Sequence, residues 1–168
     1  TIDLEHLKNL IRDDTILVSL CYVDSEVGTV QPIKEIADFL KEYPNCALHV
    51  DATQAIGKVD LDFSNVDLIS FAPHKFYGLN GFGVLLKRKG IVLDPLINGG
   101  ASTTIYRSGT PVVGQIVALE KALNTTFENF ETRRKYVKEL NDKIRNHINK
   151  YEDMYINTIN DENSYILN

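Results

Sequence analysis

Strand-like and helix-like segments alternate through the first half of the chain, and this alternation limits the fold more than any other feature. Four runs are apolar and rich in residues that favour strands: 15–23, 47–51, 66–72 and 82–86. Apolar stripes with helical spacing lie at 4–11 and 33–40. Strands that alternate with helices form a mainly parallel sheet flanked by helices, so we predict an α/β fold. We expect the first strand to be covered on both faces, because nearly all of its residues are apolar.

The second half of the chain has a different pattern. Beyond Pro111, apolar residues recur every three, four or seven positions as far as Ile148, which predicts a long helical stretch. Its basic residues alternate with acidic ones, which is typical of a solvated helix face rather than of a nucleic-acid site. The last segment, 154–168, contains two strand-like runs, and we expect them to begin a further substructure.

Charge and composition exclude several classes of protein. Eighteen basic and 23 acidic side chains give a formal net charge of −5, which argues against charge-driven binding to nucleic acid or to an anionic membrane. No apolar run is long enough to span a bilayer, and we expect no signal peptide. The two cysteines, Cys21 and Cys46, lack the spacing of a disulfide scaffold or a metal site. We therefore expect no metal and a reducing, cytoplasmic compartment.

The segment FAPHKFYG, residues 71–78, carries the clearest chemical signal. Lys75 directly follows an apolar strand and is flanked by His74 and by aromatic residues. Partial burial lowers the pKa of an amine and makes it a better nucleophile toward an aldehyde. The alternative is that Lys75 only marks the point where the strand reaches solvent.

Two further segments carry polar groups where a ligand is expected to bind. Asp51 ends another apolar strand, and Gln54 follows three residues later. A carboxylate there suits a pyridinium nitrogen, although an aspartate that caps the following turn is the alternative. The loop at 98–111 is rich in glycine and hydroxyl groups and contains Arg107, which suits an anion. An ordinary flexible loop has much the same composition.

Taken together, the motifs resemble those of the cysteine desulfurases, in the class V aminotransferase family of enzymes that use pyridoxal 5′-phosphate (PLP). The matching segments are SEVGTVQPI at 25–33, HVDATQAIGK at 49–58, DLISFAPHKFYGLNGFGVLL at 67–86, INGG at 97–100 and YRSGTP at 106–111. The resemblance implies part of the large domain of a PLP-dependent transferase of type I fold, with a long helix leading into an incomplete small domain. We expect 1–111 to belong to the large domain and 112–168 to the helix and the small domain.

The resemblance also implies roles for individual residues. Lys75 would hold PLP and move protons, and His74 would help to hold the phosphate, so that both count as catalytic. Asp51 would face the pyridine nitrogen, and Gln54 would form a hydrogen bond with the phenolic oxygen of the ring. Thr110 would donate to the phosphate in the partner subunit of a homodimer.

Some positions differ from the family pattern. Asp24 and Ser25 stand where family members usually carry an asparagine pair or Asn-Ser, so the Ser25 hydroxyl would replace an amide as donor, with Asp24 adding a negative charge. Ala72 stands where a serine usually donates to the phosphate, and Pro73 has no backbone N–H to offer.

The reaction implied by the resemblance converts L-cysteine to L-alanine and leaves sulfur as an enzyme persulfide. That sulfur would pass to an acceptor protein for iron–sulfur cluster assembly or thiolation. Cys21 is expected in the core, and Cys46 does not match the persulfide cysteine of the family, so the chain resembles a central fragment that is inactive alone. The alternatives are a selenocysteine lyase, an aminotransferase, and a non-catalytic homologue that acts as a scaffold.

Overall fold

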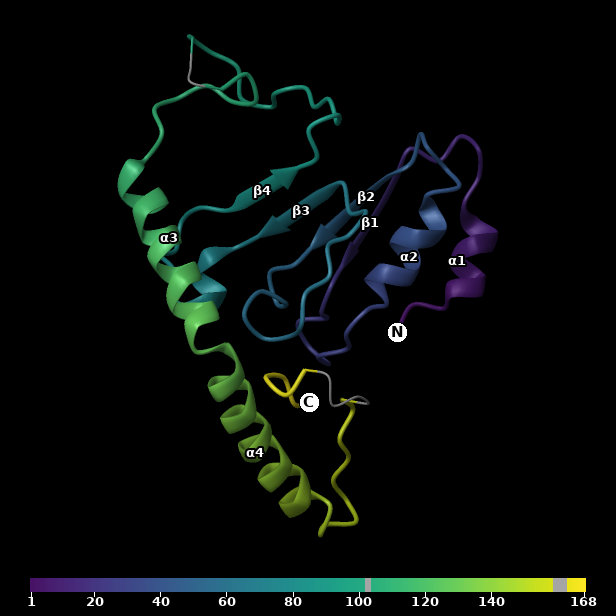
Figure 1. The fold of residues 1–168 in the computed structure, drawn as a ribbon. Helices are drawn as coiled ribbons and strands as arrows, with labels where there is room; N and C mark the ends of the chain where they lie inside the picture. The colour runs from purple at the N-terminus through teal and green to yellow at the C-terminus, as the bar shows by residue number, and fades with distance from the viewer. Residues whose placement is uncertain (102–103, 159–162) are drawn as a thin grey trace.

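The computed structural model describes residues 1–101, 104–158 and 163–168. Its sheet has the strand order β1-β2-β3-β4 (Figure 1). The strands are β1 (Leu17–Cys21), β2 (Ala47–Asp51), β3 (Leu68–Phe71) and β4 (Val84–Lys87). The first three strands are parallel, and β4 pairs with β3 in the antiparallel direction. The predicted α/β fold with a mainly parallel sheet is therefore confirmed.

Two helices precede strands and pack on the sheet. They are α1 (Leu4–Leu10) and α2 (Ile33–Leu40). The apolar stripe of α2 is buried, because its residues recur on one face of the helix; they are Ile33, Ile36, Ala37 and Leu40. This stripe joins Leu48 and Val50 of β2 in the hydrophobic core. The strand predicted at 47–51 has the expected bounds, whereas the helix that we expect to end near Tyr43 and Pro44 already ends at Leu40.

The first strand is not covered on both faces, which corrects the expectation from its apolar sequence. Exposed and half-buried residues alternate along β1. Leu17 is 49% exposed, and Cys21 is also exposed, whereas Cys46 is buried. The expectation that Cys21 lies in the core was therefore wrong: within the described chain, the side chains at alternate positions of β1 face an open side of the sheet.

The long helical stretch is divided into two helices. They are α3 (Val113–Glu128) and α4 (Phe130–Ile148), and Asn129 lies between them with non-helical backbone angles. A short 3₁₀ helix, η1 (Pro73–Phe76), follows β3 and contacts α3. None of the described helices is both long and apolar enough to cross a membrane.

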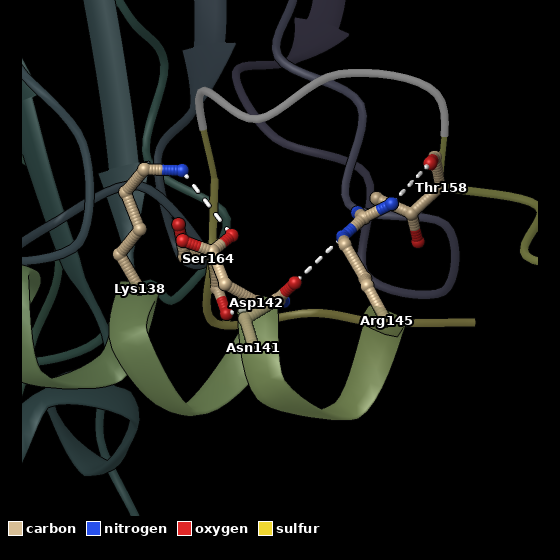
Figure 2. Close-up of polar contacts among 6 residues, drawn as sticks. All are labelled: Lys138, Asn141, Asp142, Arg145, Thr158 and Ser164. Atoms are coloured by element: carbon tan, nitrogen blue, oxygen red, sulfur yellow. Dashed lines mark hydrogen bonds and ion pairs between the residues drawn. The ribbon is translucent and has the colours of Figure 1, made fainter. Parts of the chain in front are cut away.

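The strand-like runs at 154–168 do not form strands in the part of this segment that the structure describes. Polar contacts hold the segment against α4 instead (Figure 2). Asn141 Nδ2 donates to the Ser164 carbonyl at 2.9 Å, and Arg145 Nη1 donates to the Thr158 carbonyl at 3.3 Å. Because carbonyl groups satisfied by side chains need no neighbouring strand, these contacts replace the expected pairing here.

Candidate functional site

The predicted site residues follow two neighbouring parallel strands. Asp51 is the last residue of β2 and lies opposite Ser70 of β3. The backbone N–H of Ala52 donates to the Ser70 carbonyl at 2.8 Å, so the two strands stay in register up to this edge. His74 and Lys75 lie in η1, directly after β3. The carboxyl ends of parallel strands share one edge, where α/β proteins bind ligands.

Buried neighbours hold η1 in place and leave His74 and Lys75 exposed. Phe76 is 2% exposed, and its carbonyl accepts a hydrogen bond from Thr126 Oγ1 of α3 at 3.2 Å. Tyr77 adopts a left-handed conformation with φ of 72°, which ends the turn. His74 and Lys75 are exposed between these fixed points. The turn therefore presents an amine and an imidazole from a rigid base.

A cavity of about 210 Å³ lies beside Lys75. It is lined by Ile56, Gly57, Lys58, His74, Lys75, Phe76, Tyr77, Arg133 and Tyr165. Its lining includes two lysines, an arginine and a histidine, and no acidic side chain among the described residues. An anionic ligand is therefore favoured.

Lys58 is a half-buried lysine in the lining of this cavity. Its ammonium group donates a hydrogen bond to Gln54 Oε1 at 2.5 Å. Burial and, to a smaller extent, the charge on Lys75 lower the pKa of Lys58 to about 8. Lys58 was not among the residues predicted for the site, although its position four residues after Gln54 was a signal that the two side chains meet.

Arg133 links α4 to the same cavity. Its Nη2 atom donates to the Thr126 carbonyl at 2.7 Å and to the Gly57 carbonyl at 3.3 Å. Its guanidinium group lies over the Tyr77 ring, 5.3 Å from the centroid. Because Arg133 belongs to a helix with many alternating charges, its sequence context carried no signal of this position.

The C-terminal segment also reaches this edge of the sheet (Figure 1). Tyr165 lines the cavity, and its hydroxyl is buried without a hydrogen-bond partner among the described residues. The next residue, Ile166, packs against Gly28, where an added Cβ would lie 2.9 Å from the Ile166 Cβ. A buried hydroxyl without a partner costs free energy, and an anionic ligand would supply the missing acceptor.

Asp51 and Asp24 both cap turns in the structure. Asp51 is exposed, and its Oδ1 accepts from the Thr53 backbone N–H at 2.8 Å, so the capping alternative holds for one of its two oxygens. Asp24 Oδ1 accepts from the backbone N–H groups of Glu26 and Val27, each at 2.8 Å. These bonds lower the pKa of the Asp24 carboxyl group. The Asp24 charge therefore stabilises its own loop.

Two further predicted site residues, Ser25 and Thr110, are exposed. Ser25 is exposed in the loop after β1, and its hydroxyl donates to Glu26 Oε1 at 3.3 Å. Thr110 is exposed and precedes α3. Thr126 of α3 contacts η1, and the helix rise separates Thr126 by about 20 Å from Val113, the first residue of α3. Thr110 therefore lies beyond the end of α3 that is away from η1, the 3₁₀ helix that carries Lys75.

The cysteines and possible metal ligands do not form a second site. Burial raises the pKa of the Cys21 thiol, and the charges of Asp24 and Asp51 add to this effect. Cys46 is buried, and burial also raises its pKa. Among the described residues, no group of three histidine, cysteine or acidic side chains is arranged to hold a metal ion.

Comparisons with known proteins identify the family. A family model described as "Aminotransferase class-V" matches residues 1–168. The chain belongs to the class V aminotransferase family. This family is one of enzymes, and the resemblance seen in the sequence motifs is confirmed.

Curated relatives of this class V family member are named as desulfurases. The chain is 41% identical over 155 residues to "Cysteine desulfurase IscS" of Methanosarcina thermophila, covering 91% of this chain and 38% of the relative. It is 37% identical over 159 residues to "Cysteine desulfurase IscS 1" of Archaeoglobus fulgidus, covering 94% and 41%. The chain thus spans about two fifths of the length of these relatives.

Solved structures share the fold of this class V family member. A "NIFS-LIKE PROTEIN" superposes with a TM-score of 0.89 at 34% identity, covering 96% of this chain and 45% of that one. A structure titled "SspA in complex with cysteine" superposes with a TM-score of 0.68 at 36% identity, covering 73% and 36%. The predicted fold class, as part of a larger transferase of this type, is therefore confirmed.

Proposed function

We propose that the protein is a PLP-dependent cysteine desulfurase and that this chain forms its PLP-anchoring part. The observation that carries the proposal is that Asp51, His74 and Lys75 follow neighbouring parallel strands in a chain 41% identical to a named desulfurase. The reaction converts L-cysteine to L-alanine and leaves the sulfur as a persulfide on a thiol of the enzyme. An acceptor protein then takes that sulfur for iron–sulfur cluster assembly or thiolation.

The residues present fit PLP. Lys75 supplies an exposed amine, Asp51 a carboxylate and Gln54 an amide, which match the aldehyde, the ring nitrogen and the phenolic oxygen in turn. The basic cavity beside Lys75, with the unpartnered Tyr165 hydroxyl, supports binding of an anionic ligand. When bound, PLP supplies an electron sink for the carbanion formed at Cα of the amino acid.

Each residue then has a defined task. Lys75 Nζ would hold the cofactor and would carry a proton to or from the substrate Cα. The Asp51 carboxylate would favour the protonated ring nitrogen, and the oxygen that does not cap the Thr53 turn is available for this role. His74, beside Lys75 in η1, donates to the phosphate, and Ser25 offers a hydroxyl from the loop after β1.

The persulfide thiol is assigned to neither cysteine of this chain. Cys46 is buried, and the pKa of Cys21 is raised, which keeps its thiol protonated and weakly nucleophilic. We infer that a thiol elsewhere in the assembled enzyme attacks the substrate sulfur. The 168 residues alone are accordingly expected to release no alanine from cysteine.

A homodimer completes this proposal. Thr110 precedes the end of α3 that lies away from the η1 contact, and we infer that it donates to the phosphate bound by the partner. We propose that 1–111 belongs to the large domain, that 112–168 forms the long linking helix and the start of the small domain, and that the reaction takes place in the cytoplasm.

The test uses the protein made from its complete reading frame, incubated with PLP and L-cysteine. Alanine formation and a visible absorption band from bound PLP are expected, and Lys75→Ala should remove both. Lys41→Met, a change at an exposed position of the same domain, is the control. Turnover of selenocysteine or of amino-acid and keto-acid pairs in place of cysteine would reassign the reaction. Absence of any PLP-dependent product would favour the scaffold.

A further inference from the structure

We propose that Lys58 is a positioning residue that orients the Gln54 amide, so that its Nε2 group is left to donate to the phenolic oxygen of the cofactor. This inference rests on the proposed function and deepens it. It concerns a residue to which the sequence motifs assigned no role. The juxtaposition that carries it is the direct hydrogen bond between the Lys58 and Gln54 side chains.

The turn that holds both residues is rigid. Backbone hydrogen bonds from Ile56 to Ala52 and from Val59 to Ala55 form helical turns that bring positions four apart onto one side. Ala52, Ala55 and Val59 are almost fully buried in the core. Lys58 Nζ therefore reaches Gln54 Oε1 at 2.5 Å from a fixed backbone.

The chemistry of the two groups allows one orientation of the amide. An ammonium group carries donors and no acceptor, so Lys58 can face only the carbonyl oxygen of Gln54. The amide nitrogen then points to the other side, and Nε2 has no protein partner among the described residues. A phenolic oxygen that carries negative charge needs a donor and would be repelled by a carbonyl oxygen. Lys58 thus selects the amide orientation that the cofactor requires.

The location of Lys58 supports a role beyond general stability. Its amine is half-buried and lies near the charge of Lys75, and both features disfavour its protonated form. Exposure to solvent would stabilise the protonated form of this amine better than its present position does. Its hydrogen bond to Gln54 is the side-chain bond that offsets this unfavourable position.

The test compares Lys58→Met, Lys58→Arg and the control Lys41→Met in the protein made from its complete reading frame. Lys58→Met removes the donor at similar length, whereas Lys58→Arg keeps donors. We expect Lys58→Met to weaken PLP binding about tenfold, as loss of one charge-assisted hydrogen bond does, and to shift the absorption maximum of bound PLP. Lys58→Arg should restore much of the affinity, and Lys41→Met should change neither quantity. Thermal unfolding checks that each variant is folded.

A double-mutant cycle separates orientation of Gln54 from a direct effect on Lys75. In a Gln54→Ala background, Lys58→Met should cause no further loss of PLP affinity. An equal loss in both backgrounds, or unchanged affinity in Lys58→Met, would overturn the inference while PLP binding and alanine formation by the unmodified protein still support the proposed function. Failure of the unmodified protein to bind PLP would overturn both.

Discussion

Lys58 and Lys75 line the same cavity of about 210 Å³, and the charge on Lys75 helps to lower the pKa of Lys58 to about 8. The larger cause is burial of the Lys58 amine. Two amines are thus held together on a turn and a 3₁₀ helix that are each anchored in the core. This relationship makes the site sensitive to pH and to changes in the packing beneath it.

The first prediction concerns pH and Lys58. Its folded-state pKa is about 8 against an ordinary value of 10.5, so the unfolded state binds more protons between these limits. The contribution of Lys58 to the free energy of unfolding should therefore rise as pH increases from about 8 to 10.5. Urea unfolding of the ligand-free protein at several pH values measures this. The free energy of unfolding of the unmodified protein should therefore increase relative to that of Lys58→Met across this range. A constant difference for Lys58→Met would contradict the assigned shift.

The second prediction concerns the contact between Gly57 and α3. Gly57 has a φ of +72°, and an added Cβ would lie 2.1 Å from Thr126 Cγ2. Gly57→Ala should destabilise the protein by about 3 kcal/mol, through a left-handed alanine and an overpacked contact. Thr126→Ser removes that methyl group and should recover part of the loss in the double variant. Gly90→Ala, with nothing within 4 Å of the added Cβ, is the neutral control in denaturant unfolding. A loss no larger than that of Gly90→Ala would count against this packing.

The third prediction concerns the Asp24 turn. Its carboxylate accepts two backbone hydrogen bonds, and its pKa is lowered from the ordinary 3.8. The stability it provides is present above that value and is lost as pH falls through the lower folded-state pKa. Asp24→Ala should lower the melting temperature at pH 7 and have a smaller effect at pH 3. Asp24→Asn, which keeps an acceptor, should retain more stability at pH 7. An equal loss at both pH values would show that the carboxylate charge is not responsible.

The sequence predicted the local elements well where one physical signal dominated. The stripe of α2 and the alternation of β2 each indicate a single buried face, so the buried residues of α2 and the bounds of β2 agree with the structure. The burial of Cys21 was predicted wrongly because an apolar run does not reveal whether a second layer covers the strand. The break at Asn129 was missed because helical spacing of apolar residues continues across it.

The site was predicted in part for a related reason. Asp51 and Lys75 follow strands, and the topology of a parallel sheet brings the ends of strands to one edge. Arg133 and Tyr165 reach the same cavity from segments far along the chain. Their positions depend on how α3 and α4 pack, which no local pattern near either residue reports.

The fourth prediction concerns Cys21. Cys21 is exposed as a residue, but partial desolvation of its thiol and the charges of Asp24 and Asp51 raise the thiol pKa. Cys21 should therefore react with iodoacetamide more slowly than an unhindered thiol at pH 7.5, and Cys21→Ser should leave alanine formation unchanged in the PLP-loaded protein. Mass spectrometry of alkylated peptides measures the first quantity. Rapid alkylation together with loss of activity in Cys21→Ser would instead assign the sulfur-accepting thiol to this position.

The fifth prediction concerns Tyr165, whose buried hydroxyl has no partner among the described residues in the ligand-free protein. Removing an unsatisfied buried hydroxyl relieves a desolvation cost, so Tyr165→Phe should leave the ligand-free protein as stable as before or about 1 kcal/mol more stable. If the hydroxyl donates to an anionic ligand in the cavity, the same change should weaken PLP binding several-fold. The two effects have opposite signs, which a merely structural tyrosine would not produce. Tyr136→Phe, at an exposed position of α4, is the matched control in unfolding and PLP titration. A loss of stability in Tyr165→Phe with unchanged PLP affinity would show that the hydroxyl serves the fold and not the ligand.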